Sequence, residues 1–278
     1  MKIVLPSDSV PVTDRALGVG HGLFETVLVV QGIPVLLAQH LHRLEKGAKA
    51  LHINIELDKL KLELDKFLKS VDRSDFVVKL ILTSGDGGRG YTINQGSESR
   101  LILQDFPAPT LSDKLWSSGL RLRVCDHRLP HNPALAGYKH INRLDQIIAR
   151  AEWDSDEFDD AIVLDQNDNV IEAISSNLFM AIGGKLYTPS LQNCGVAGTM
   201  RSYLMDNLES IFAMPVIETE LNIQHLEEVD ALFMANSVRG IRPIGSVAKV
   251  RDCIPIDAVR KIAVAVHAVL GLRHLMPN

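Results

Sequence analysis

The sequence predicts an α/β (α+β) protein of two domains, in which mixed sheets with hairpins pack against helices. Apolar runs with strand character alternate with segments of helical periodicity along the chain. The length of 278 residues, 46% of them hydrophobic, is enough for two domains of ordinary size. Residues 107–119 are rich in proline and serine and show no periodicity. We therefore expect a small N-terminal α/β domain at 1–108, a linker at 109–119 and a larger C-terminal domain at 120–278.

The first domain is expected to contain a hairpin, two helices and two further strands. Residues 23–30 and 33–37 are apolar runs on either side of Gln31 and Gly32, a pair that suits a tight turn. The segments of helical periodicity and the later strands, which flank a glycine-rich loop, are residues 38–51, 57–71, 76–84 and 100–106.

The second domain is expected to begin with a strand and continue as a meander between helices. A short helix with apolar Leu144, Ile147, Ile148 and Ala151 follows the first strand. Short apolar runs separated by turn residues then predict successive hairpins. The strands are expected at 120–126, 160–165, 170–173, 177–182, 185–189 and 231–237, and the later helices at 199–211 and 256–270.

Composition favours a small-molecule partner. The net charge of −5 and the isoelectric point near 6.1 give no global field for nucleic acid or an anionic membrane. The first residues lack the apolar core of a signal peptide, so the default location is the cytoplasm. Cys125, Cys194 and Cys253 lie far apart and fit neither a disulfide framework nor a metal knuckle, so we expect inert thiols and no metal.

Two ionisable residues could take part in chemistry with an aldehyde cofactor. Lys139 stands in "LAGYKHINRLDQ", just ahead of the short helix, and a lysine becomes a nucleophile when desolvation or a neighbouring charge lowers its pKa. Glu172, at the end of the strand "VIEA", could keep the ring nitrogen of pyridoxal phosphate protonated. Each could instead be an ordinary surface or turn charge when taken alone.

Three further features could bind a phosphate group. "GVAGTMR" places a glycine-containing loop before a helix, whose first N–H groups and dipole attract anions, although an ordinary helix cap explains it equally well. Arg43 could be a phosphate ligand or a cation on a helix surface. Ser237 follows a strand, where its hydroxyl could donate to phosphate or cap a turn.

In the order of these features along the chain and in their local sequence setting, the protein resembles the fold-type IV pyridoxal-phosphate enzymes. This family includes branched-chain aminotransferases, D-amino-acid aminotransferases and 4-amino-4-deoxychorismate lyases. The similarity runs over nearly the whole chain, and "NPALAGYKHINRLDQ", "SGDGGRGY" and "GVAGTMR" are more similar to the lyases than to the transaminases. The resemblance implies a homodimer of two-domain subunits that binds pyridoxal 5'-phosphate at the domain interface.

The resemblance also implies roles for individual residues. Lys139 matches the Schiff-base lysine and Glu172 the partner of the ring nitrogen. Arg43, the backbone of Thr199 and Met200, and Ser237 match the phosphate-binding positions. One departure is visible, because the transaminase tyrosine that faces the cofactor phenolate is absent from "HINRL". Asn142 and Arg143 are open alternatives for that position.

For the substrate side, the resemblance implies Lys79, Arg89 and Tyr91 as binding residues and Thr26 as a residue beside the reacting centre. 4-Amino-4-deoxychorismate carries two carboxylates, and fixed cations suit them, whereas a branched aliphatic substrate would favour an apolar pocket. Lys139 would remove a proton from the substrate, and Thr26 would assist proton delivery to the departing enolpyruvate. The implied products are 4-aminobenzoate, a folate precursor, and pyruvate.

Two other functions stay open. A branched-chain or D-amino-acid aminotransferase would use the same cofactor residues, and only the substrate-side positions separate it from a lyase. A non-enzymatic protein could retain the fold without a cofactor, and the glycine-rich "GDGGRGY" would then be a solvated hairpin. The complete set of cofactor residues argues against this second alternative.

Overall fold

The computed structural model describes residues 1–93, 96–110, 114–154 and 156–276. Residues 111–113 of the predicted linker and 94–95 of the predicted glycine-rich loop lie outside the described residues. Contacts between Cα atoms divide the chain into two units. The first comprises Met1–Pro109 and Tyr138–Asn142, and the second comprises Thr110–Gly137 and Arg143–Asn278. This division differs from the predicted one, because five residues around Lys139 belong to the first unit.

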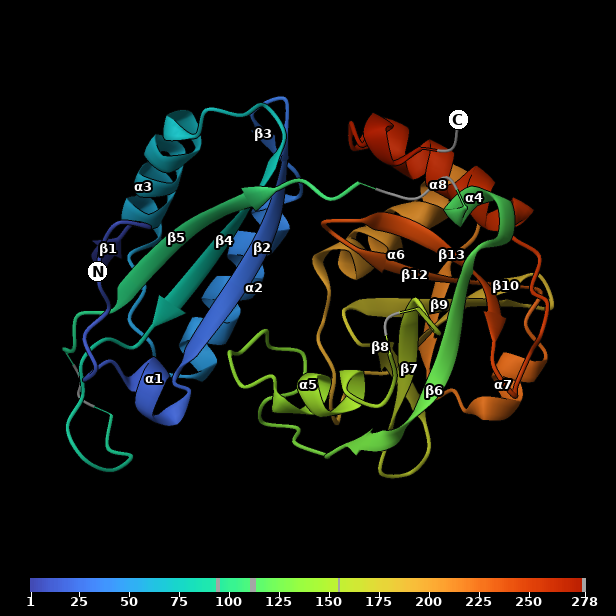
Figure 1. Ribbon diagram of the computed structural model, residues 1–278, viewed down its shortest axis with the longest axis horizontal. Helices are drawn as coiled ribbons and strands as arrows, with labels where there is room; N and C mark the ends of the chain where they lie inside the picture. The colour runs from blue at the N-terminus through green and yellow to red at the C-terminus, as the bar shows by residue number, and fades with distance from the viewer. Residues whose placement is uncertain (94–95, 111–113, 155, 277–278) are drawn as a thin grey trace. The chain divides into compact units, whose positions relative to one another are not determined.

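The first unit is a five-stranded sheet with strand order β1-β5-β4-β2-β3 and two long helices (Figure 1). Its elements are β1 (Lys2–Val4), α1 (Arg15–Val19), β2 (Gly22–Val30), β3 (Ile33–Pro34), α2 (Leu37–Ala50), α3 (Leu57–Ser70), β4 (Phe76–Thr83) and β5 (Arg100–Pro107). Gln31 and Gly32 join β2 to β3 and have positive φ angles of 50° and 75°. Positive φ at both central residues is typical of the two-residue turns that suit the twist of a β-hairpin. The predicted hairpin is therefore confirmed.

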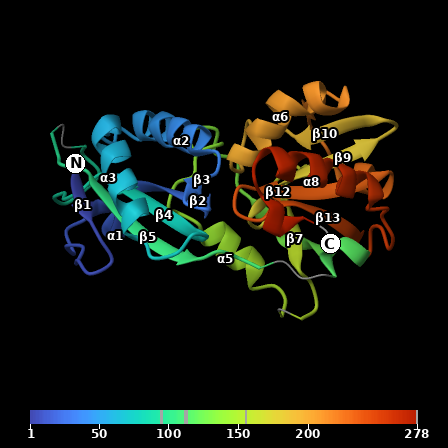
Figure 2. The same ribbon diagram turned by 90° about the horizontal axis from the view of Figure 1, so that it is seen from above.

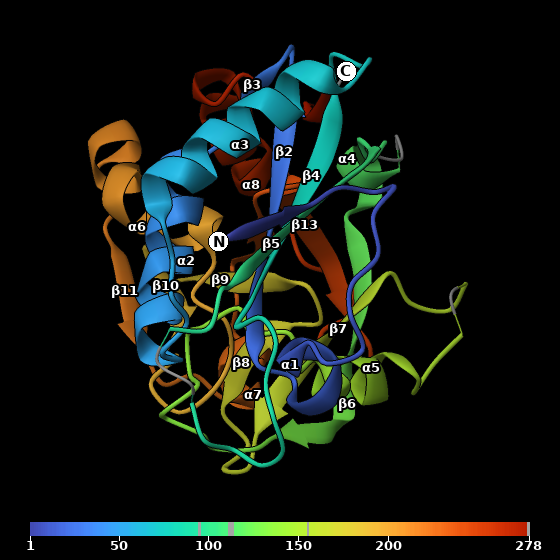
Figure 3. The ribbon, with the colours of Figure 1, turned by 90° about the vertical axis from the view of Figure 1, so that its left-hand side faces the viewer.

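The core of the first unit lies between the sheet and its helices. Alternate residues of β2, Leu23, Val27 and Val29, are buried against apolar residues of α2 and α3. Leu44 and Leu64, one from each helix, are 1% exposed. Figure 3 shows both helices running across the same side of this sheet. The opposite face of β2 therefore carries the even-numbered residues, because successive side chains of a strand point to opposite faces.

The second unit contains a closed ring of strands. Its eight-stranded order is β11-β10-β9-β12-β13-β6-β7-β8, and an additional pairing of β8 with β9 closes six of these strands. Its strands are β6 (Leu120–Leu129), β7 (Asp160–Asp165), β8 (Val170–Ala173), β9 (Ser176–Ile182), β10 (Lys185–Pro189), β11 (Val216–Thr219), β12 (Ala231–Asn236) and β13 (Gly240–Val247). All six ring strands contribute buried residues to one apolar cluster, which fills the ring as in a small barrel.

Five α-helices and a 3₁₀ turn complete the described part of the second unit. They are α4 (Leu115–Ser118), α5 (Leu144–Arg150), α6 (Thr199–Phe212), α7 (Ile223–Glu227), α8 (Asp257–Val269) and the turn at Arg273–Leu275. The helix α8 lies against β12 and β13 (Figure 2). The helix α6 packs on β11 and β12. The predicted α/β (α+β) class with mixed sheets and hairpins is confirmed.

Two predicted features differ from the structure for physical reasons. Residues 115–118 of the predicted linker form α4, because Leu115 and Trp116 are buried against β13. The apolar stripe of the helix after Lys139 is largely exposed, with Leu144, Ile147 and Ile148 at 71%, 62% and 53%. Periodicity therefore located α5 correctly, but it could not show that this face is exposed within the chain.

Candidate active site

Lys139 lies on a segment that extends the sheet of the first unit. The Phe24 N–H donates to the Lys139 carbonyl at 2.9 Å, and the Ile141 N–H donates to the Gly22 carbonyl at 3.1 Å. His140 forms an antiparallel bridge with Leu23, and Tyr138 packs against the core of this unit. Backbone hydrogen bonds thus fix the predicted anchor lysine beside the first residues of β2.

Two ammonium groups lie over one aromatic ring on the face of the sheet away from the helices. Lys139 Nζ is 4.4 Å and Lys79 Nζ 5.4 Å from the centroid of Phe24, within the range of cation–π attraction. Lys79 of β4 stands directly opposite Thr26 of β2, and Thr26 shares a face with Phe24. The structure therefore brings three predicted residues, Lys139, Lys79 and Thr26, to the Phe24 face.

Arg43 is held on the helix side of the same sheet by a buried carboxylate. Its Nε donates to Glu25 Oε1 at 2.8 Å and its Nη2 to Glu25 Oε2 at 2.5 Å. His40 Nδ1 lies 2.6 Å from Glu25 Oε2. Glu25 and His40 are each 1% exposed, whereas the Arg43 side chain retains 12% exposure. Neither Glu25 nor His40 was predicted, because nothing in a single sequence pairs a strand carboxylate with a particular helix.

The charges of this cluster are set by burial and by the ion pair. Burial alone would raise the pKa of Glu25, but the charge and hydrogen bonds of Arg43, with a contribution from His40, lower it to about 2. Burial lowers the pKa of His40, the hydrogen bond and charge of Glu25 oppose this shift, and the charges of Arg43 and Lys139 add to it, so that the net shift is downward. At neutral pH, Glu25 is therefore ionised and His40 is neutral, with its proton on the Nδ1 that faces the carboxylate.

The substrate-side loop predicted from "SGDGGRGY" is tied to the chain around α1. Arg15 Nη1 donates to the Gly90 carbonyl at 3.2 Å, and the Gly87 N–H donates to the Thr13 carbonyl at 3.2 Å. Arg89 and Tyr91 are exposed, Tyr91 by 85%, and neither side chain has a hydrogen bond or ion pair within the described residues. The loop is thus fixed at its backbone, while its two predicted binding residues face outward.

A buried ion pair supports the start of this loop. Arg100 Nη1 donates to Asp14 Oδ2 at 2.7 Å, and Thr83 Oγ1 donates to the same oxygen at 2.8 Å. Arg100 also pairs with Asp86, a loop residue. Gly85 has a φ of +78°, and a Cβ there would lie 2.0 Å from the Glu98 carbonyl oxygen. Glycine is therefore required where the loop leaves β4.

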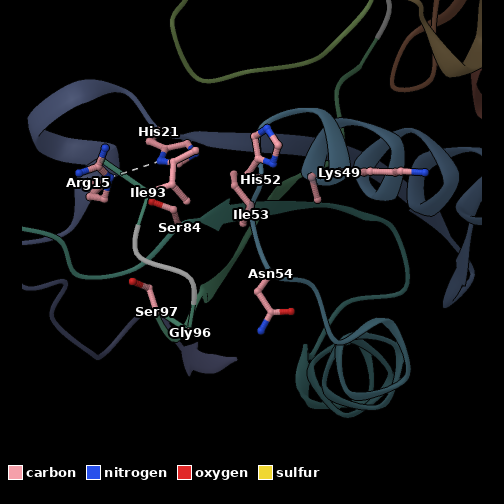
Figure 4. A pocket seen from close by; sticks show the side chains of 11 residues that line it. Arg15, His21, Lys49, His52, Ile53, Asn54, Ser84, Ile93, Gly96 and Ser97 are labelled. Carbon is pink, nitrogen blue, oxygen red and sulfur yellow. Dashed lines mark hydrogen bonds between the residues drawn. The ribbon is translucent and has the colours of Figure 1, made fainter. Parts of the chain in front are cut away.

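A pocket of about 440 Å³ lies beside this loop in the first unit (Figure 4). Arg15, His21, Lys49 and His52 are among the residues that line it, and the described lining residues include no carboxylate. Arg15 Nε donates to His21 Nδ1 at 3.3 Å within this wall. None of the predicted site residues lines the pocket, so it is separate from the Phe24 face and from Arg43.

Glu172 is buried in the second unit and bound to the glycine-containing loop. It lies on β8, is 5% exposed, and its Oε2 accepts a hydrogen bond from the Val196 N–H at 2.9 Å. Gly195 has a φ of +87°, and a Cβ there would come within 2.8 Å of Ile171 and Leu191. A close approach of this loop to β8 therefore depends on glycine.

Asn177 of β9 fastens the rest of this loop. Its Nδ2 donates to the Val196 carbonyl at 2.8 Å, and its Oδ1 accepts from the Gly198 N–H at 3.1 Å. A parallel bridge joins Gly137 to the loop, with the Gly137 N–H donating to the Gly195 carbonyl at 2.9 Å. Asn177 was not predicted, although its place in "SSNLF", close after Glu172, was the available signal.

The helix start that follows suits an anion. Gly198 is the N-cap of α6 and brings no side-chain acceptor, and the first turn contains no acidic residue. Thr199 and Met200, 3% and 0% exposed, are the first two residues of this 14-residue helix. The N–H groups and dipole of a helix N-terminus attract phosphate. Burial of both side chains fixes the backbone that would bind it.

The remaining predicted residues occupy turns. Ser237 follows β12 and is 8% exposed, in a turn where Asn236 Oδ1 accepts from the Val238 and Arg239 N–H groups. Asn142 Nδ2 donates to the Gly20 carbonyl at 3.0 Å, and Arg143 is the N-cap of α5. These contacts fix the two ends of the link between the lysine segment and α5.

The predicted site residues thus fall into two groups. The first unit carries the lysines, Thr26, Arg43 and the loop residues, and the second carries Glu172, Thr199, Met200 and Ser237.

Burial raises the pKa of Cys125 and Cys194 to about 12, which keeps both thiols protonated. Within the described residues there is no cluster of three metal-ligating side chains. Nor does any described helix combine the length and apolar character needed to cross a bilayer.

Comparisons with known proteins give a consistent result. The model of the class IV amino-transferase family matches residues 22–247. Aminodeoxychorismate lyase of Vibrio harveyi is 31% identical over 245 residues, which cover 88% of this chain and 89% of that enzyme. The crystal structure of 4-amino-4-deoxychorismate lyase from Pseudomonas aeruginosa has a TM-score of 0.90 at 37% identity, covering 95% of this chain and 97% of that one. A putative branched-chain-amino-acid aminotransferase of Methanocaldococcus jannaschii is 28% identical, over 84% of this chain and 81% of its own length.

Proposed function

The chain belongs to the class IV aminotransferase family, and we propose that within this family it is a pyridoxal-phosphate-dependent 4-amino-4-deoxychorismate lyase. Its products would be 4-aminobenzoate and pyruvate. The observation that carries the proposal is the second ammonium group, Lys79, on the Phe24 face beside Lys139. Two fixed cations suit a substrate with two carboxylates, whereas an aliphatic amino acid carries a single carboxylate and would favour an apolar pocket for its side chain. The similarity to two lyases supports the same conclusion.

The residues present fit the cofactor that this family uses. Glu172 is a buried carboxylate with one oxygen bound to a backbone N–H, which suits a partner for a protonated ring nitrogen. The N-terminus of α6 has a glycine cap and no acidic residue, which suits a phosphate group. We propose that Thr199, Met200, Ser237 and Arg43 bind this phosphate and that Lys139 binds the aldehyde carbon.

The bound cofactor supplies an electron sink for a carbanion on the substrate. Lys139 would act as the base that accepts the proton from C4 of the substrate ring. Enolpyruvate would leave as the C–O bond at the neighbouring ring carbon breaks. Thr26 shares the Phe24 face and would help deliver the proton that converts enolpyruvate to pyruvate. Lys79, Arg89 and Tyr91 bind the carboxylates and orient the ring. Formation of an aromatic product favours elimination over transamination.

A coupled assay tests the proposal. Purified protein is incubated with 4-amino-4-deoxychorismate, 4-aminobenzoate is followed by fluorescence, and pyruvate by lactate dehydrogenase. Equal amounts of the two products are expected, and both should disappear in Lys139→Ala. Lys114→Ala, which removes an exposed lysine of the second unit, is the matched control and should retain full activity. Normal output from Lys139→Ala would contradict the proposed role of this lysine.

An aminotransferase for branched-chain or D-amino acids is the alternative, because the similarity to the Methanocaldococcus jannaschii protein is nearly as extensive. The same preparation is therefore offered L-isoleucine or D-alanine with 2-oxoglutarate, and glutamate is measured. Faster glutamate formation than 4-aminobenzoate formation would favour the aminotransferase. A colourless protein that cannot be reconstituted with cofactor, and that borohydride does not modify, would favour a non-enzymatic function.

We further propose that the enzyme is a cytoplasmic homodimer. Three large apolar side chains of α5, Leu144, Ile147 and Ile148, are more than half exposed, and contact with a second copy would remove them from water. Light scattering on the purified protein measures the molar mass. A mass near 30.6 kDa at all concentrations would contradict the dimer.

A further inference from the structure

We propose that Glu25, supported by His40, is a positioning residue that fixes the orientation of the Arg43 guanidinium for the phosphate of the cofactor. This inference rests on the proposed function, in which Arg43 is a phosphate ligand. Glu25 does not itself contact the phosphate in this proposal. It acts through Arg43, and its effect is therefore confined to ligands that carry a phosphate group.

Two hydrogen bonds to Glu25 restrain the orientation of Arg43. Glu25 accepts one hydrogen bond from Nε and one from Nη2, at 2.8 and 2.5 Å, so two parallel contacts restrain the guanidinium. Of the five guanidinium N–H groups, three point away from Glu25, two of them on Nη1. The 12% of the Arg43 side chain that remains exposed limits where another ligand can approach.

His40 restrains the carboxylate in turn. It lies three residues before Arg43 on α2, so both side chains lie on the same face of the helix. Its Nδ1–H reaches Glu25 Oε2 at 2.6 Å, the oxygen that also accepts from Arg43 Nη2. One strand residue and two residues on one helix face therefore meet at a buried carboxylate.

Charge alone does not explain why Glu25 is there. The carboxylate cancels the charge of Arg43, so it weakens the attraction of this site for an anion. A buried ion pair also adds little to stability compared with apolar side chains that fill the same space. The pair does provide a fixed direction for the remaining N–H groups of Arg43, and a residue that binds phosphate needs this property.

Glu25→Gln separates the two effects. It makes the site more positive by one charge, so electrostatics alone predicts tighter binding of phosphate. In either orientation of the new amide, one of the two hydrogen bonds to Arg43 is lost, because an NH₂ group replaces an acceptor. Positioning therefore predicts weaker binding. Glu25→Asp keeps the charge but shortens the side chain, and it should also weaken binding.

The experiment compares pyridoxal 5'-phosphate with pyridoxal, which lacks the phosphate but can still react with Lys139. Apoprotein is titrated with each, and the dissociation constants are measured from the absorbance of the bound chromophore. In Glu25→Gln and Glu25→Asp, the constant for pyridoxal 5'-phosphate should rise roughly tenfold, as expected for one misaligned charge-assisted hydrogen bond. The constant for pyridoxal should not change.

Leu64→Ala is the matched control. It removes a buried side chain of α3 in the same unit, and the ratio of the two dissociation constants should stay at the wild-type value. Unchanged or tighter binding of pyridoxal 5'-phosphate by the folded Glu25 variants would overturn the inference, as would an equal loss for both ligands. If both Glu25 variants fail to fold, His40→Leu provides the same comparison. A wild-type protein that binds neither ligand would instead overturn the proposed function.

Discussion

Gly198→Ala should damage the start of α6 through one identifiable contact. The new Cβ would lie 2.0 Å from Asn177 Oδ1, and Cβ atoms in proteins essentially never approach a neighbour more closely than 3.0 Å. Asn177, which is 5% exposed, must therefore retreat by at least about 1 Å, beyond the small adjustments that a packed interior absorbs easily. Its hydrogen bonds to Val196 and Gly198 would both be lost.

The expected loss of stability follows from those two bonds. At about 1 kcal/mol net for each, with up to about 1 kcal/mol more for alanine in place of glycine at the N-cap, the free energy of unfolding should fall by about 2–3 kcal/mol. Urea unfolding followed by tryptophan fluorescence measures it, because Trp116 and Trp153 both lie in the same unit as Gly198. The dissociation constant of pyridoxal 5'-phosphate should rise in parallel.

A double-mutant cycle with Asn177→Ala isolates this contact. Without the asparagine the methyl group has room, so Gly198→Ala should cost only the N-cap difference of up to about 1 kcal/mol. The coupling free energy should therefore be about 2 kcal/mol, equal to the two bonds lost. The same cost of Gly198→Ala in both backgrounds would refute the contact as the cause.

Three further predictions concern the remaining features. Thr26→Val should lower kcat for pyruvate formation while leaving the dissociation constant of pyridoxal 5'-phosphate unchanged, and equal losses in both would indicate a structural role. Arg89→Ala should raise KM for 4-amino-4-deoxychorismate without loss of the bound chromophore, and bleaching would contradict a substrate-side position. Burial lowers the pKa of His267 from 6.5 to about 4, so the unfolded chain binds a proton first as pH falls. The contribution of neutral His267 to the free energy of unfolding should therefore be fully present above pH 6.5 and should fall by at most about 3 kcal/mol towards pH 4. Urea unfolding at several pH values should show a smaller decline in His267→Phe.

The regular elements with strong periodicity could be predicted from the sequence. Leucine spacing located α2 and α3 to within about one residue at each end. The strand β13 was not predicted, because it contains Pro243 between two glycines, and proline is uncommon in a strand that pairs on both sides. Its place between β12 and β6 depends on tertiary pairing that local propensity does not encode.

The residues that support the site were harder to predict than the chemical groups themselves. Phe24 and Glu25 belong to a predicted strand, but alternation alone does not say that one lies under two lysines and the other binds Arg43. Asn177 likewise has no motif, since its function is to hold a loop that begins 18 residues later. Such contacts join segments that are distant in sequence, and a single sequence taken alone contains no record of them.

The assignment of residues 138–142 to the first unit has a consequence for engineering. The chain enters this short segment from the second unit and returns to it, so a cut at Pro109 does not yield two independent modules. A chimera of two relatives joined there would combine the β2 edge of one parent with the lysine segment of the other. The backbone pairing of Phe24 with Lys139 would then join segments of two different parents. Recombination would be safer if residues 138–142 were inherited together with residues 1–109.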